Sequence, residues 1–263
     1  MTASTAEVIS GVIRLAIGLF VTIRMLRMPG IGRHSANGVF YLFALVCLVF
    51  AECYWMIYDL LQMNARMPIA ANELCEGAMF LLLAKELKTV FPKKFFFYKR
   101  EVFAAMLFIA ASVVLWIVWS GEWLQDILGG LCFGYLMCSC VIALKEEQLL
   151  TRTAWRSMLA GCVVLIALQA GVQLSSGQIS HGFDLAAYLL MAAGEALILA
   201  KAVSLFRKRS GYRSLLAISF SGFIWSTSCF YMSSGSWYIF HYVISIVYIF
   251  MMWEAVKKEV LGA

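Results

Sequence analysis

Apolar residues fill the chain in runs of about 20, and short polar segments separate the runs. A run of that length lets an α-helix cross the roughly 30 Å of hydrocarbon in a bilayer. The pattern predicts spans at residues 8–26, 38–60, 67–86, 102–120, 124–144, 155–174, 182–205, 214–232 and 238–256. The predicted fold class is therefore all-α, a polytopic membrane helix bundle of about nine transmembrane helices.

Composition supports this prediction and limits the domain organisation. The 263 residues are 63% hydrophobic and 14% charged, whereas about a quarter of the residues in a soluble domain are charged. The longest gap between predicted spans, 87–101, is too short for a folded soluble domain. We therefore expect one integral membrane domain over residues 1–263, with the activity in its helices or in a partner chain.

Basic residues alternate between the two sides of the predicted bundle. They occupy the first, third, fifth and seventh connections and the C-terminal end, whereas the intervening connections hold only Arg66. Because cytoplasmic loops carry an excess of Lys and Arg, the alternation predicts an outside N-terminus and a cytoplasmic C-terminus. The alternation also accounts for the net charge of +6, so we expect no nucleic-acid partner. For the location of the protein we expect the plasma membrane.

The intervening connections are short, which predicts four antiparallel hairpins closed at the outer face. The segments "EGAMFLLLAKELKTVF" and "GEALILAKAVSLFRK" each place a Glu before an L-A-K step and a Phe after it. This similarity suggests a duplication, with helix 1 at 8–26, repeat A at 38–150 and repeat B at 155–260. Resemblance between apolar helices through composition alone is the alternative.

The prolines indicate unbroken helices, and the cysteines indicate a bundle without disulfides. Pro29, Pro68 and Pro92 lie at or near span ends, so that the broken helices of many ion-coupled transporters are not indicated. All eight cysteines fall within predicted spans. We expect them to act as small apolar residues rather than to form disulfides.

Polar residues within the spans align on helix faces, and ionisable residues at such positions are functional-site hypotheses. The candidate ligand-binding or proton-binding residues are Arg14, Glu52, Trp55, Glu73, Glu76, Gln169, Tyr188, Glu195 and His241. The predicted orientation puts them in the outer half of the membrane, with Glu195 nearest its middle. The sequence therefore predicts an acidic, aromatic-lined pocket that opens to the outside, and no comparable set in the inner half of the membrane away from its basic border.

Structural roles are the alternatives for these residues. The glutamates could serve only as hydrogen-bonding groups, Arg14 could form an ion pair with one of them, and His241 could only donate a hydrogen bond. Glu73 and Glu76 lie one turn apart, and two carboxylates in a low dielectric cannot both ionise cheaply. A shared proton, Arg14 or a cationic ligand would each resolve the conflict.

Catalytic and metal-binding motifs are not found. The chain has no H-E-x-x-H, G-x-S-x-G or phosphate-loop pattern, and its histidines are scattered. We expect no cofactor and no metal. Three functions remain: a transporter for a small polar or cationic solute, a receptor or sensor subunit that signals through a protein partner, and an intramembrane lipid-modifying enzyme. The expected partners are the lipid bilayer, the small ligand and, for a sensor, a cytoplasmic or membrane protein.

Overall fold

The computed structural model describes residues 5–29, 36–61, 70–174, 181–206, 211–232 and 237–261. Within these residues the chain forms nine α-helices and a short 3-10 helix, η1 (Phe95–Tyr98). The α-helices are α1 (Thr5–Leu26), α2 (Ala36–Leu60), α3 (Ala71–Val90), α4 (Lys99–Ser120), α5 (Trp123–Glu146), α6 (Arg152–Leu174), α7 (His181–Phe206), α8 (Tyr212–Met232) and α9 (Trp237–Leu261). Each one corresponds to a predicted span, so the all-helical prediction is confirmed.

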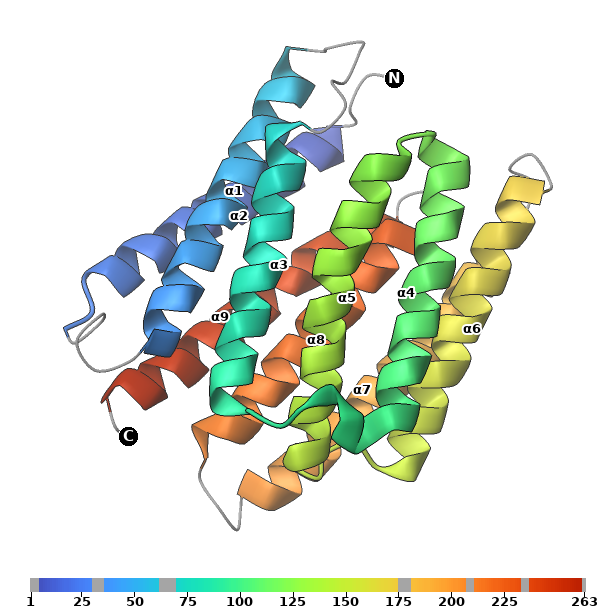
Figure 1. Ribbon diagram of the computed structural model, residues 1–263. Coiled ribbons are helices and arrows are strands. Elements are labelled where there is room, and N and C mark those ends of the chain that lie inside the picture. Colours follow the sequence, from blue (N-terminus) through green and yellow to red (C-terminus); the bar gives the residue numbers. More distant parts are fainter. Residues whose placement is uncertain are drawn as a thin grey trace.

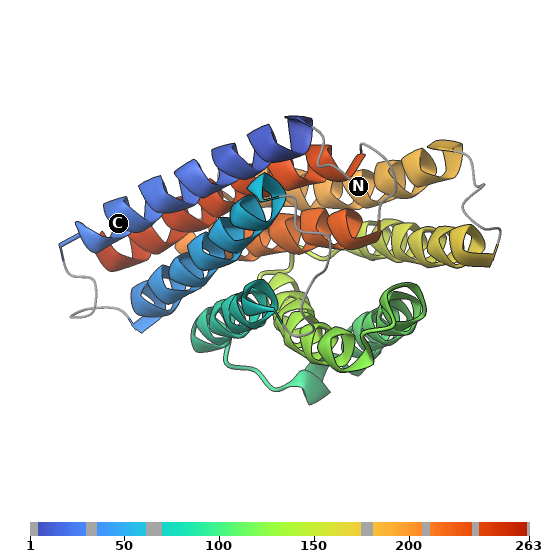
Figure 2. The same cartoon turned by 90° about the horizontal axis from the view of Figure 1, so that it is seen from above.

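The helices form two layers. Figure 2 shows α3, α4 and α5 as one layer, lying against a second layer made by the other six helices. Helix α8 lies near the middle of the molecule (Figure 1), and every side chain from Leu216 to Cys229 is buried. A single cluster of buried apolar side chains draws on all nine helices, which is compatible with the single domain that was predicted.

Six of the described helices, namely α1, α2, α4, α5, α6 and α7, are long and apolar enough to cross a membrane. Helix α3 carries several charges, among them Glu76 and Lys85. Helix α8 is rich in serine, but its serines face other helices rather than lipid: Ser219 and Ser226 are completely buried. A helix that is enclosed by protein can hold such residues without being apolar.

The outer surface of the bundle is strongly apolar. Phe50, Val118, Leu131 and Val163 are each at least 60% exposed, and many other large apolar side chains are also exposed. Contiguous apolar patches of more than a few hundred Å² are rare on soluble proteins. The surface therefore suits lipid as its solvent, in agreement with a membrane protein.

Close contacts at glycine hold the hairpin helices together. A Cβ added at Gly161 of α6 would lie 2.4 Å from Cγ of Met191, and one added at Gly194 of α7 would lie 2.3 Å from Cγ of Met158. The two methionines thus pack reciprocally on the two glycines. Small residues permit this approach of helix backbones in membrane bundles. The internal duplication stays a prediction.

Candidate functional site

Arg14 and Glu52 form an ion pair between α1 and α2. Arg14 Nε lies 3.2 Å from Glu52 Oε1, and the two side chains are only 12% and 5% exposed. Each charge compensates the other in an environment where an uncompensated charge is costly. The alternative in which Arg14 pairs with an acid is thus observed, and Glu52 is that acid.

The Glu73 and Glu76 carboxylates have separate hydrogen-bond donors. Helix α3 begins at Ala71, and Glu73 Oε2 accepts a hydrogen bond from the backbone N–H of Ala70 at 2.9 Å. Trp55 Nε1 on α2 donates to Glu76 Oε1 at 3.3 Å. Both acids lie in the first turns of α3, where the helix macrodipole favours negative charge. Helix capping and Trp55 together explain how this segment tolerates two acids.

Glu195 lies in the interior of the bundle and is 3% exposed. Ser221 Oγ on α8 donates to Glu195 Oε2 at 2.8 Å, whereas Glu195 Oε1 has no hydrogen-bond partner among the described residues. Tyr188, two turns earlier on α7, is 5% exposed. Tyr188 and Glu195 are therefore both buried on one side of α7.

Two further residues, Gln169 and His241, were predicted to bind a ligand. Gln169 is half-buried on α6, and its neighbour one turn later, Gln173, donates to the carbonyl oxygen of Leu115 on α4 at 2.8 Å. The side chain of His241 lies outside the described residues. The interactions above thus form two groups, one on α1 to α3 around Glu52 and Glu76, and one on α7 and α8 around Glu195.

Sequence reasoning missed Glu86, which is completely buried near the C-terminal end of α3. Neither of its carboxylate oxygens has a hydrogen-bond partner in the part of the chain that is described. The predicted span ended at residue 86, beside basic residues, whereas α3 continues to Val90. Glu86 thus lies at the basic border of the span, a region for which the sequence predicted no functional residue. Periodicity could have found Glu86, since it follows Met79 and Leu83 at helical spacing on the buried face.

Several ion pairs surround this basic end of the bundle. Arg213 at the start of α8 lies 3.0 Å from Glu147 and 3.5 Å from Glu146, both measured between nitrogen and carboxylate oxygen. Ser214 Oγ donates to Glu147 Oε2 at 2.6 Å, and Lys145 pairs with Glu101. The network joins α4, α5 and α8, so these basic residues have a structural role.

Two groups at this end titrate in an altered environment. Burial raises the pKa of Tyr212, and the charge of Glu259 adds to the effect. Burial lowers the pKa of Lys88, and the charge of Glu146 opposes that change. Partial burial is thus the main electrostatic influence on both side chains.

Comparison of the chain with protein-family profiles, with curated protein sequences and with solved structures finds no match. Functional argument therefore depends on the geometry of these buried groups. Among the described residues, no group of three or more His, Cys, Asp and Glu side chains is placed to hold a metal ion. The eight cysteines are all unpaired. The chemistry that the described groups supply is proton exchange, ion pairing and hydrogen bonding.

Proposed function

We propose that this protein is a multi-pass membrane transporter for a small polar or cationic solute, with buried carboxylates that bind substrate, proton or both. The observation that carries the proposal is that Glu86 and Glu195 are almost fully buried and that the described residues offer no hydrogen-bond partner to either oxygen of Glu86 or to Oε1 of Glu195. An ionised carboxylate in that setting costs several kcal/mol unless it is compensated. A proton or a cation must therefore neutralise each one, and exchanging the two is the elementary step of ion-coupled transport.

We further infer that all nine helices cross the plasma membrane, with the N-terminus outside. Helices α3, α8 and α9 are not among the six described helices that are long and apolar enough to cross a membrane. Glu86 of α3 and the serines of α8 from Ser219 to Ser228 are buried within the bundle, whereas Lys85 and Lys258 lie toward the basic ends of α3 and α9. Buried polar groups and charges near helix ends are both compatible with spanning a bilayer. The alternation of basic residues supports the orientation.

The buried acids lie at different levels along their helices. Glu195 is near the middle of α7, whereas Glu86 is close to the basic, proposed cytoplasmic end of α3. Glu52 is held by Arg14 in the apolar part of α2. In the proposed orientation, Glu195 would be reached from the membrane interior and Glu86 from the cytoplasmic side. Binding groups at successive depths are what a transported proton or cation requires.

Proteoliposomes test the proposal. The vesicles contain the purified protein and a trapped pH-sensitive dye, and an imposed proton gradient is challenged in turn with guanidinium, choline and methylammonium. We expect at least one of these probes to accelerate collapse of the gradient, and Glu86→Gln and Glu195→Gln to abolish the acceleration. The matched control is Glu122→Gln, since Glu122 is exposed at the turn between α4 and α5. Vesicles that behave like protein-free vesicles with all three probes would count against transport.

A receptor or sensor subunit is the second candidate. The described helices run without interruption, whereas many ion-coupled transporters use broken helices at the binding site. Such a protein would bind its ligand and signal through a partner at its basic face. Ligand binding without flux in the vesicle assay would favour this candidate over transport.

A further inference from the structure

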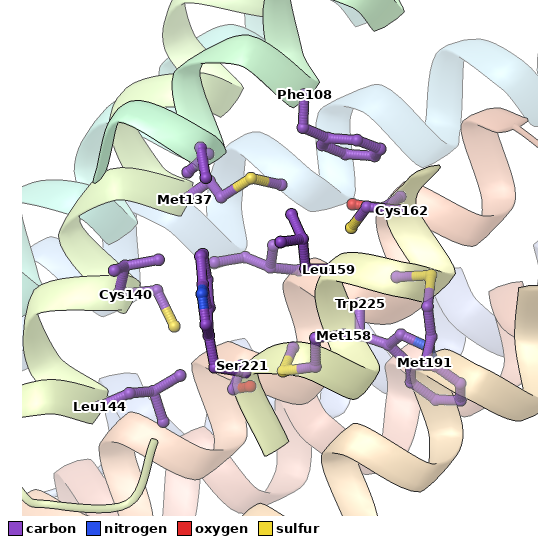
Figure 3. A pocket seen from close by; sticks show the side chains of 16 residues that line it. Phe108, Met137, Cys140, Leu144, Met158, Leu159, Cys162, Met191, Ser221 and Trp225 are labelled. Atoms are coloured by element: carbon purple, nitrogen blue, oxygen red, sulfur yellow. The ribbon is translucent and has the colours of Figure 1, made fainter. Parts of the chain in front are cut away.

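A small cavity of about 80 Å³ lies between α4, α5, α6, α7 and α8. Its walls include the rings of Phe108, Trp155 and Trp225. Side chains from these separate helices converge on the same space (Figure 3). None of the residues that were predicted from the sequence to bind a ligand lines it, and no lining residue carries a formal charge.

Sulfur atoms make up much of the remaining wall. They belong to Met137, Cys140, Met158, Cys162 and Met191 (Figure 3). Methionine is flexible and polarisable, and it is common where a surface adapts to ligands of different shape. The pocket therefore suits an apolar molecule whose outline is not strictly defined.

The polar part of the wall leads to Glu195. Ser221 lines the pocket and donates its hydroxyl hydrogen bond to Glu195 Oε2 at 2.8 Å. Glu195 Oε1 and Ser228 Oγ have no hydrogen-bond partners among the described residues, and both side chains are at most 3% exposed. A carboxyl group with an unused oxygen thus lies directly behind Ser221, one side chain away from the pocket.

We propose that this pocket binds a lipophilic organic cation, with Glu195 as its counter-ion. The proposal names the substrate class of the transporter proposed above and rests on that function. Aromatic rings attract cations through their negative faces, the apolar wall favours burial of hydrocarbon, and Glu195 supplies the opposite charge in a medium of low dielectric.

The same features exclude other ligand classes. A lipophilic anion of equal size would be repelled by Glu195. A metal cation such as Na⁺ would lose its water to an apolar wall that offers few oxygen atoms in return. A neutral apolar molecule would fit the wall but leave Glu195 uncompensated, so that it would bind more weakly than the cation.

Two ions of nearly the same shape test the charge requirement. Equilibrium dialysis of the purified full-length protein in detergent compares tetraphenylphosphonium with tetraphenylborate, and protein-free micelles correct for partitioning. We expect saturable binding of the phosphonium and none of the borate. Glu195→Gln is expected to weaken phosphonium binding about tenfold or more, equivalent to about 1.4 kcal/mol, whereas Glu122→Gln leaves it unchanged.

A second measurement needs no substitution and so does not depend on a variant that folds. Bound phosphonium should slow the alkylation of Cys162, which lines the pocket, and leave that of Cys53 on α2 unchanged. Mass spectrometry of the alkylated peptides reads out both rates. Equal protection of the two cysteines, equal binding of the two ions, or no binding of either ion would overturn the proposal.

The outcomes also separate this inference from the proposed function. Phosphonium binding without accumulation in proteoliposomes would preserve the pocket and refute transport. Proton-coupled flux of guanidinium, choline or methylammonium without phosphonium binding would preserve transport and refute the pocket.

Discussion

Replacing Arg14 by Met tests whether the ion pair with Glu52 is a structural requirement. The substitution keeps much of the side-chain volume but removes the positive charge 3.2 Å from Glu52 Oε1. Glu52 is 5% exposed, so it cannot recover its hydration in the folded state. Removing one partner of a buried ion pair typically costs about 3–5 kcal/mol.

Protonation limits this loss and makes it depend on pH. In the Arg14→Met variant, Glu52 can bind a proton in the folded protein while it ionises in the unfolded chain. Protonating a carboxyl group of ordinary glutamate pKa costs about 3.7 kcal/mol at pH 7 and about 1 kcal/mol at pH 5. The variant should therefore be destabilised by up to about 4 kcal/mol at pH 7, and the loss should shrink as the pH falls.

Thermal unfolding in a mild detergent, followed by tryptophan fluorescence at pH 5 and pH 7, measures the effect. At pH 7 a loss of that size lowers the melting temperature by on the order of 10 °C. The double variant Arg14→Met with Glu52→Leu should be close to the wild type, since an apolar pair can replace a buried ion pair without loss. Arg24→Met, at the exposed end of α1, is the control.

Additivity would refute the reasoning. If the two single losses simply summed in the double variant, the side chains would not be acting on each other. A loss for Arg14→Met that is the same at pH 5 and pH 7 would also contradict it, because Glu52 would then not be the group left uncompensated. A double variant that folds normally but loses transport would assign the pair to the binding site.

Two further substitutions test packing and capping, again by thermal unfolding in detergent. Gly222→Ala would place a Cβ 1.9 Å from the ring of Tyr248 and should cost about 1–3 kcal/mol. Gly129→Ala meets no atom within 4 Å and should gain up to about 1 kcal/mol in helix propensity, so equal effects would contradict the packing argument. Glu73→Ala removes the acceptor for the N–H of Ala70 and should cost about 0.5–2 kcal/mol, whereas Glu73→Gln should retain most of the stability. Unchanged stability with weaker solute binding would instead assign Glu73 to the ligand site.

The positions of the helices could be predicted from the sequence because they depend on a local property. A run of about 20 apolar residues matches the thickness of a bilayer wherever it occurs in the chain. Helix α3 is shifted relative to its predicted span. It begins at Ala71 rather than at residue 67 and ends at Val90 rather than at 86. Glu73 caps its first turn, a signal that was present in the sequence but was interpreted as a ligand contact.

Only the tertiary structure shows which polar groups form ion pairs and hydrogen bonds with one another. Which face of a helix meets which neighbour depends on rotations and crossing points, and these follow from close contacts such as Gly161 with Met191. Hydrophobicity along the chain does not contain that information. The sequence placed Glu52 and Glu195 within spans and suggested Arg14 as an ion-pair partner, but it did not determine that Arg14 pairs with Glu52 or that Ser221 donates to Glu195.

The sequence by itself thus determined an all-helical bundle and placed several acids within its helices. The tertiary structure decided that Glu73 and Glu76 are accommodated by capping and by Trp55, that Glu86 is buried with no hydrogen-bond partner among the described residues, and that five helices line an apolar pocket near Glu195. The physical reason is that burial in a membrane helix is set by local composition, whereas compensation of a buried charge requires a second group from elsewhere in the chain.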